Sequence, residues 1–224
     1  MTTLLLNRPP RHHVRTLGWG ERIVLWTDGC SIGRTAPCPS CVSPETWAGT
    51  NGVAVPVAEL AEQLRARAEV HDGLTISGGE PSDQEESLVA LLEAFGAVPD
   101  HWEILLYSGH RLATLRRRHR RLLARVDVVV DGRFDPAKVT PTLPWRGSAN
   151  QHLTVVSDRA IAWARYGDAH LSRPHPAPQL HLERGAAGVA VELIGIPRPD
   201  GELTTFEAAM ARQGLNLELP GGRR

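Results

Sequence analysis

Residues 22–41 read RIVLWTDGCSIGRTAPCPSC, an apolar run followed by three cysteines. The segment Arg22–Trp26 is typical of a short buried strand, because four consecutive apolar residues follow its arginine. Cys30, Cys38 and Cys41 come soon after it and are the only cysteines of the chain. A strand that ends in a loop of reactive side chains is typical of α/β proteins, which build their sites beyond the carboxyl ends of strands. We therefore expect an α/β protein with its site in this loop.

Strands and helices alternate after the cysteine loop. The expected strands lie at residues 74–76, 103–107 and 126–130, and the expected helices at residues 57–68, 87–95 and 110–124. Such alternation predicts a parallel sheet with right-handed crossovers. The turns that follow these strands should then meet at one edge of the sheet. They are residues 77–81 (SGGEP), 107–109 and 131–133.

The two ends of the chain lack this regular alternation. Residues 1–15 are rich in Pro, His and Arg, and we expect an irregular lead-in there. Residues 171–179 contain three prolines and are typical of a linker. Further expected elements are strands at residues 152–157 and 188–196 and a helix at residues 205–212.

Composition and charge narrow the class of protein. The chain has 224 residues, 42% of them hydrophobic, which suits one domain or one domain with an extension. Its formal net charge is zero, so we expect no nucleic-acid or membrane partner. The basic run RRRHRR at residues 116–121 lies in an expected helix without interleaved aromatic residues, which favours a solvated helix face. Because no apolar stretch approaches the roughly 20 residues of a membrane helix and no signal peptide is evident, we expect a cytoplasmic protein.

The three cysteines indicate a metal site or redox chemistry, because an odd number grouped so tightly does not suit a disulfide framework. Their spacing is C-x7-C-x2-C. Three thiolates can hold three irons of a cubane cluster, which leaves one iron open for a ligand. Zinc is an alternative, with His12 or His13 as a fourth ligand. Three unreactive loop cysteines are a further alternative, and the spacing alone does not separate iron–sulfur from zinc.

The turn Gly78-Gly79-Glu80-Pro81 follows an expected strand. Two glycines permit backbone torsions and close approaches that side chains forbid. Exposed carbonyl groups and a carboxylate suit a cationic ammonium group. An isolated GGEP is typical of an ordinary turn, but its position after a three-cysteine loop favours an iron–sulfur site with a neighbouring ligand.

Five segments, in order along the chain, resemble the radical S-adenosylmethionine superfamily and, within it, the activating enzymes of anaerobic ribonucleotide reductase. They are DGCSIGRTAPCPSCVSPETW, DGLTISGGEPSDQ, ILLYSGH, VDVVVDGRFD and LPWRGSANQ, within roughly residues 16–152. The resemblance implies a partial open (β/α) barrel, with a radical S-adenosylmethionine core at residues 1–155 and a C-terminal extension at residues 156–224. It implies an oxidoreductase that uses a [4Fe–4S] cluster to cleave S-adenosylmethionine reductively to a 5′-deoxyadenosyl radical, which abstracts hydrogen from a target.

The same resemblance implies which residues hold the cofactors. The cluster ligands would be Cys30, Cys38 and Cys41. The amino group of S-adenosylmethionine would contact Gly78, Gly79 and Glu80. Further cofactor contacts are expected from Tyr107, Ser108, Arg133 and Arg146. An arginine suits a carboxylate because its donors form a fork, although ties between loops would explain both arginines equally well, and a core position would explain the tyrosine.

Four more polar residues match the pattern of the activating enzymes, and we expect them chiefly to cap helices and tie loops together. They are Asp131, Ser148, Asn150 and Gln151. The implied partners are reduced flavodoxin or ferredoxin, as electron donor, and a glycyl-radical enzyme whose backbone glycine is the target.

Two departures from the family pattern bear on the substrate. The usual spacing is C-x3-C-x2-C, so the first gap here is four residues longer, and Ser40 stands before the last cysteine where an aromatic residue or glycine is common. The extension from about residue 155 is also longer than a minimal activating enzyme needs, and we hypothesise that it covers the cleft. The alternatives are a radical enzyme acting on a peptide or small molecule, and a non-catalytic iron–sulfur or zinc regulatory module.

Overall fold

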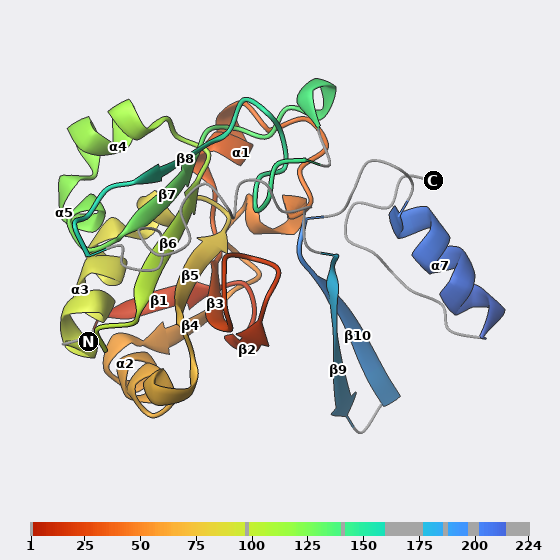
Figure 1. The fold of residues 1–224 in the computed structure, drawn as a ribbon, viewed down its shortest axis with the longest axis horizontal. Helices are drawn as coiled ribbons and strands as arrows, with labels where there is room; N and C mark the ends of the chain where they lie inside the picture. Colours follow the sequence, from red (N-terminus) through yellow and green to blue (C-terminus); the bar gives the residue numbers. More distant parts are fainter. Residues whose placement is uncertain are drawn as a thin grey trace.

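The computed structural model describes residues 2–96, 99–139, 142–159, 177–185, 188–196 and 202–213. Its centre is a mixed sheet with helices packed against it (Figure 1). The strands are β1 (Thr3–Leu6), β2 (Arg11–Val14), β3 (Arg22–Thr27), β4 (Val53–Pro56), β5 (Gly73–Gly78), β6 (Glu103–Ser108), β7 (Val128–Asp131) and β8 (His152–Val155). Neighbouring strands follow the order β4-β1-β3-β5-β6-β7-β8, and β2 pairs with β3.

The four central strands β3, β5, β6 and β7 run parallel, with Ile76 of β5 in register with Leu25 and Leu106 on either side. Every residue of β3 and β7 is buried, as expected for parallel strands covered on both faces. These are the strands expected at residues 22–26, 74–76, 103–107 and 126–130. The α/β class and the mostly parallel centre are therefore confirmed, whereas the barrel form of the core stays a prediction.

Antiparallel strands flank this parallel centre. β8 pairs antiparallel with β7, and β1 pairs antiparallel with both β3 and β4. The irregular lead-in expected at residues 1–15 is therefore wrong. Leu4 and Leu6 of β1 are fully buried, and the amide group of Gln84 bonds both backbone groups of Leu5. The short apolar run acquires its strand structure from partners distant in the sequence, which a local pattern does not reveal.

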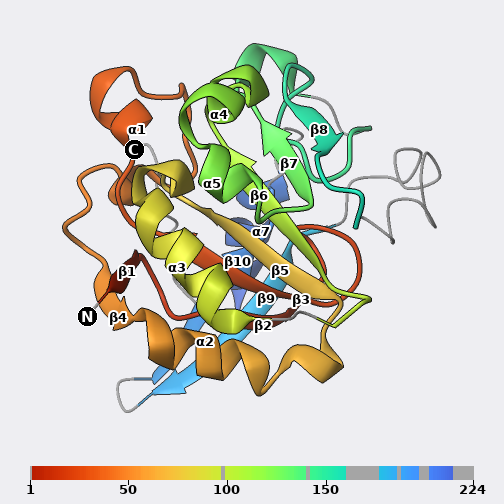
Figure 2. The same cartoon turned by 90° about the vertical axis from the view of Figure 1, so that its left-hand side faces the viewer.

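The helices between the strands pack against one face of the sheet (Figure 2). They are α2 (Val57–Arg65), α3 (Glu85–Phe95), α4 (Leu112–Arg118) and α5 (Arg120–Leu123), while α1 (Ser31–Thr35) lies in the cysteine loop. Short 3-10 helices are η1 (Pro44–Thr46), η2 (Ala68–Val70), η3 (Pro81–Gln84) and η4 (Pro136–Lys138). Leucines of α2 and α3 bury against β1, β3, β5 and β6 in one core, which confirms the helices expected at residues 57–68 and 87–95.

The single helix expected at residues 110–124 is interrupted at His119. This residue has φ −126° and ψ 44°, which is not helical, and it separates α4 from α5. Its Nδ1 lies 2.9 Å from a carboxylate oxygen of Glu85 in α3, a contact distant in the sequence. Leu115 and Leu122 face the core on either side of the break. The arginines of the basic run 116–121 are exposed, in agreement with a solvated face.

The C-terminal part contributes a two-stranded antiparallel hairpin, β9 (Gln179–Gly185) and β10 (Gly188–Ile194), and a helix, α7 (Glu202–Arg212) (Figure 1). The strand and helix expected at residues 188–196 and 205–212 are confirmed. The expected linker at residues 171–179 runs into β9 at Gln179, while its residues 171–176 lie outside the described residues. No helix within the described residues is long and apolar enough to cross a membrane.

Candidate functional site

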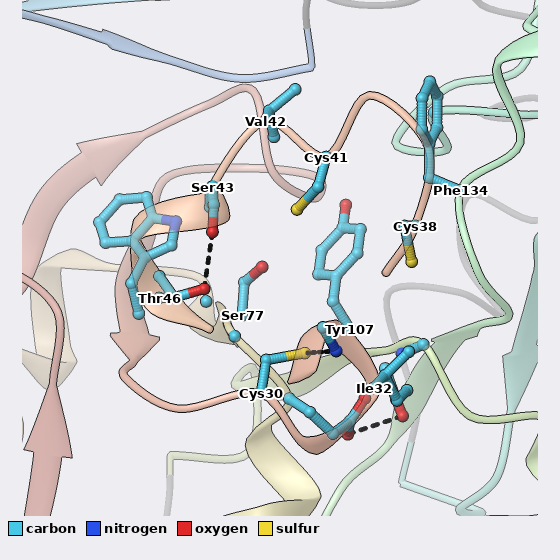
Figure 3. Close-up of a pocket in the computed structure, with 18 of the residues that line it drawn as sticks. Cys30, Ile32, Cys38, Cys41, Val42, Ser43, Thr46, Ser77, Tyr107 and Phe134 are labelled. Carbon is cyan, nitrogen blue, oxygen red and sulfur yellow. Dashed lines mark hydrogen bonds between the residues drawn. The ribbon is translucent and has the colours of Figure 1, made fainter. Parts of the chain in front are cut away.

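A cavity of about 420 Å³ lies at the carboxyl ends of the parallel strands (Figure 3). Its wall includes the three cysteines and residues from the turns that follow β5, β6 and β7. The predicted meeting of these turns is therefore confirmed. The volume falls in the range of about 300–1,000 Å³ that small-molecule and cofactor sites occupy.

Cys30 begins the helical turn α1, which the residues of the long C-x7-C gap form. Its Sγ accepts a hydrogen bond from the backbone N–H of Gly33 at 3.1 Å, as a helix-capping side chain does (Figure 3). Ser31 donates from both its backbone N–H and its hydroxyl to Asp83, at 2.5 and 2.7 Å. The longer spacing is thus accommodated by a folded turn tied to the segment after the GGEP turn.

The turn α1 packs tightly against its surroundings. A Cβ at Gly33 would lie 2.2 Å from Cδ1 of Trp47, so only glycine fits there. Arg34 donates to the carbonyl of Trp47 at 3.1 Å, and Arg133 donates to the carbonyl of Ala36. These contacts hold Cys30 and the start of the cysteine loop in a defined place on the cavity wall.

All three thiols are partly buried, and none forms a disulfide. Burial raises the pKa of Cys30 to about 11 and also raises the pKa of Cys41. A thiolate in such surroundings needs a cationic partner, and iron would supply that charge.

The placement of the cysteines bears on which metal they suit. Among the described residues, no three His, Cys, Asp or Glu side chains lie close enough to hold one ion. A cubane cluster instead takes each thiolate on a different iron, so three separated cysteines around one cavity fit it. The rings of His12 and His13 lie tilted against that of His71, just before β5 at the opposite edge of the sheet, with ring centroids 5.7 and 4.6 Å away. The zinc alternative with either histidine is therefore wrong.

The two glycines of the GGEP turn let it pack directly on the cysteine loop. Gly78 has φ +119°, and a Cβ on it would lie 2.3 Å from backbone atoms of Thr27. A Cβ on Gly79 would lie 2.1 Å from the carbonyl oxygen of Gly29, which accepts a hydrogen bond from Glu80 N–H at 2.9 Å. Side chains are excluded at both positions, because the obstacles are rigid backbone atoms.

The Glu80 carboxylate is buried and accepts four hydrogen bonds from protein groups. One oxygen accepts from the N–H and hydroxyl of Ser82, at 3.1 and 2.7 Å, and from the hydroxyl of Ser108 at 2.9 Å. The other accepts from the N–H of Gly109 at 2.8 Å. Glu80 therefore ties the turn after β5 to the turn after β6, and its contact with a ligand amino group stays a prediction.

The remaining predicted contacts differ in where they lie. Tyr107, Ser108 and Arg133 are on the cavity wall, whereas Arg146 is absent from it. The Tyr107 hydroxyl donates to the carbonyl of Trp145 at 2.9 Å, and burial raises its pKa. Arg146 is half-buried, burial lowers its pKa, and its Nε has no hydrogen-bond partner among the described residues.

The four polar residues expected to tie loops together do so. Gln151 accepts from Gly147 N–H at 2.7 Å and donates to Gly132 O at 2.9 Å, and it also lies on the cavity wall. The other ties run from Asn150 to Arg133 O, from Asp135 N–H to Ser148, and from Leu112 N–H to Asp131.

Part of the cavity wall comes from segments that carry no recognisable motif. Arg8 and the run from Leu193 to Ile196 lie on it, although they are distant in the sequence from the cysteine loop. The apolar character of residues 188–196 predicts a strand, but nothing in it indicates where that strand packs. These residues could not have been assigned to the site from the sequence.

Comparisons with known proteins show which family this chain matches. The model of the 4Fe–4S single cluster domain family matches residues 16–154. The anaerobic ribonucleoside-triphosphate reductase-activating protein of Haemophilus influenzae is 31% identical over 139 residues, covering 60% of this chain and 87% of the relative. The proteins of the same description from Vibrio cholerae and Escherichia coli K12 are 34% and 27% identical, with 87% and 88% of each covered. The crystal structure of QueE from Escherichia coli matches at 16% identity with a TM-score of 0.37, covering 49% of this chain and 54% of that one.

Proposed function

Because this chain belongs to the 4Fe–4S single cluster domain family and to the anaerobic ribonucleoside-triphosphate reductase-activating proteins, we propose that it activates a glycyl-radical enzyme, first of all an anaerobic ribonucleotide reductase. It is a radical S-adenosylmethionine enzyme whose cofactors are a [4Fe–4S] cluster and S-adenosylmethionine. One observation supports the proposal above the others, namely that the three cysteines and the GGEP turn line the same cavity.

Cys30, Cys38 and Cys41 are the proposed cluster ligands. Three thiolates would hold three of the four irons and would leave the fourth without a protein ligand. When bound, the two cofactors supply an electron transfer that yields a 5′-deoxyadenosyl radical able to abstract hydrogen from the target. The electron would come from reduced flavodoxin or ferredoxin in the cytoplasm.

The other wall residues position S-adenosylmethionine. Gly78 and Gly79 let the backbone of the turn pack directly on the cysteine loop, and both glycines line the cavity in which the amino group is proposed to bind. Glu80 adds negative charge next to that ammonium group and also fixes the shape of the turn. Tyr107 and Ser108 are the proposed contacts of adenosine.

The two arginines have different proposed roles. Arg133 lies on the wall and can reach a carboxylate or ribose. Arg146 lies off the wall, so we assign it to docking of the target or to support of the loop that holds Tyr107. The Tyr107 hydroxyl donates to the carbonyl of Trp145, the residue before Arg146.

The division into a core at residues 1–155 and an extension at residues 156–224, and the partial barrel of that core, are part of the same proposal.

A second candidate target is a peptide or small molecule. It is favoured by Arg8 and the residues from Leu193 to Ile196, which line the cavity from outside the region matched by the family. Because these residues lie outside the family-matched region, they could give this protein a different substrate preference from that of its relatives.

The test of the chemistry uses full-length protein reconstituted with iron and sulfide under anaerobic conditions. We expect a reduced-cluster signal in the electron paramagnetic resonance spectrum that changes on addition of S-adenosylmethionine, and formation of 5′-deoxyadenosine. The Cys38→Ala variant should lose both. A cluster that ignores S-adenosylmethionine would contradict the proposed reaction.

The test of the target adds an anaerobic ribonucleotide reductase to the same mixture. We expect a protein radical whose spectrum narrows when the reductase is made with deuterated glycine. Steady formation of 5′-deoxyadenosine without a radical on the reductase would favour the peptide or small-molecule candidate.

A further inference from the structure

The C-terminal hairpin lies at the cofactor cavity as well as beside the sheet. Leu193 and Ile194, at the end of β10, and the two residues that follow, Gly195 and Ile196, line the cavity. Residues 16–154 match the 4Fe–4S family, so these residues belong to a part of the chain that the family model does not contain.

The end of β10 is fixed to the core by apolar packing and a buried hydrogen bond. Ile194 is only 2% exposed and packs in one cluster with Val14, Leu17, Val24 and Trp26. Its carbonyl accepts a hydrogen bond from the buried hydroxyl of Thr16 at 3.1 Å. This end of the hairpin is therefore part of the packed interior.

Ion pairs also hold the hairpin, at Glu192, two residues before Ile194 in the same strand. The Glu192 carboxylate accepts from Arg8 at 2.5 Å and from Arg11 at 2.7 Å. Burial opposes ionisation of this carboxyl, yet hydrogen bonds from Arg11 and Arg8 hold its pKa below the usual value. The two arginines come from residues 8–11, and the carboxylate from β10, so the contact joins the two segments that flank the family-matched region.

Arg8 is neutralised within this contact. Its guanidinium lies 5.2 Å from the ring centroid of Trp26, which also lines the cavity, and a second carboxylate, that of Glu45, is 3.4 Å away. Two carboxylates and an aromatic face account for its charge, so Arg8 holds the wall in place and is not a free anion-binding group.

We propose that the end of β10 (Leu193 and Ile194) and residues 195–196 form a fixed wall that encloses bound S-adenosylmethionine, and that Arg8 and Arg11 are positioning residues that hold this wall through Glu192. The inference rests on the proposed function, because it assigns the wall to the cavity of that reaction. The wall excludes water from the radical site, and its apolar end at Leu193 and Ile196 admits an uncharged stretch of the target.

The test measures access to the cluster in the full-length holoprotein. An anionic iron chelator is added anaerobically, and loss of cluster absorbance is followed in wild type and in Glu192→Gln. Glu183→Gln is the matched control, since this exposed residue of the same hairpin pairs with Arg11 at 3.2 Å and is not on the cavity wall. We expect iron loss about fivefold faster in Glu192→Gln, as for loss of a partly buried ion pair, with a similar rise in the dissociation constant of S-adenosylmethionine. The control should match wild type, and Glu192→Asp should restore most of the protection.

A second variant covers the case in which Glu192→Gln does not fold, which circular dichroism would reveal. Ile196→Ala keeps every ion pair and shortens the wall, and it should also accelerate iron loss. If both variants fold, load a cluster and bind S-adenosylmethionine, yet lose iron at the wild-type rate, the proposed wall is wrong and the proposed function stands. A wild-type chain that takes up no cluster would overturn both.

Discussion

Replacing Glu80 with glutamine tests whether the GGEP turn is held by its carboxylate. In the variant, the amide oxygen can still accept from Ser82 and Ser108. The amide NH2 then faces the N–H of Gly109, which in the wild type donates to the carboxylate at 2.8 Å. One charge-assisted hydrogen bond is lost and a buried donor is left unpaired, at a combined cost of about 3 kcal/mol. For a chain of this size, that lowers the midpoint of thermal unfolding by roughly 6–12 °C.

The assay is thermal and denaturant unfolding of the full-length protein, followed by circular dichroism with and without S-adenosylmethionine. Glu86→Gln makes the same chemical change on a side chain that is 77% exposed, and its free energy of unfolding should stay within about 1 kcal/mol of wild type. If Glu80→Gln were as stable as Glu86→Gln while binding S-adenosylmethionine more weakly, the carboxylate would serve the ligand alone, and the reasoning from its four protein donors would be refuted.

Three further changes have defined expected outcomes. Gly33→Ala places a methyl group 2.2 Å from Trp47, and this overpacking should cost about 1–3 kcal/mol and displace the cysteine turn. The iron bound per chain after reconstitution should therefore fall. An unchanged iron content would contradict the close packing. Arg22 is fully buried and donates to Thr75 and to three backbone carbonyls, so Arg22→Met should cost about 3–5 kcal/mol in denaturant unfolding, and Arg22→Lys should recover only part of it. Burial, and to a lesser degree the positive charge of Arg67, lowers the pKa of half-buried His12 from 6.5 to about 4. Between these two pH values the unfolded chain binds more protons than the folded chain, so the free energy of unfolding falls as the pH drops from 6.5 to about 4. After allowance for solvent screening the loss is about 1 kcal/mol, and His12→Phe should flatten this part of the pH profile of unfolding; an identical profile would assign the effect to other groups.

The parallel centre of the fold could be predicted because its strands carry their own signal. β3 and β5 are short apolar runs that end in turns of distinctive composition, so both the strands and the meeting of Cys30 with Gly78 follow from local sequence. The class of cofactor could be predicted from the family resemblance that these residues carry together with the other matching segments, because the cysteine spacing alone does not separate iron–sulfur from zinc. Each of these signals lies within a few consecutive residues, and the parallel pairing of β3 with β5 then brings the two turns together.

What could not be predicted depends on contacts between distant residues. β1 is a strand because Leu4 and Leu6 find buried places beside β3 and β4, and the break at His119 coincides with a contact to Glu85 in another helix. Arg146 lies in a segment that resembles the family, yet it is not among the residues of the cavity wall. A pattern of residue types fixes which side chains are available, and only packing fixes where they point.

The ion pair between Arg8 and Glu192 joins residues 184 positions apart, and this separation has a consequence for how the protein is made. A chain emerges from the ribosome N-terminus first, so the cavity loops up to Gln151 are complete before Glu192 exists. At typical rates of about 5–20 residues per second, the roughly 40 intervening residues take about 2–8 s to synthesise. During that interval the chain lacks Leu193 to Ile196, so these residues can join the cavity wall only after the cysteine loop and the turns have been synthesised.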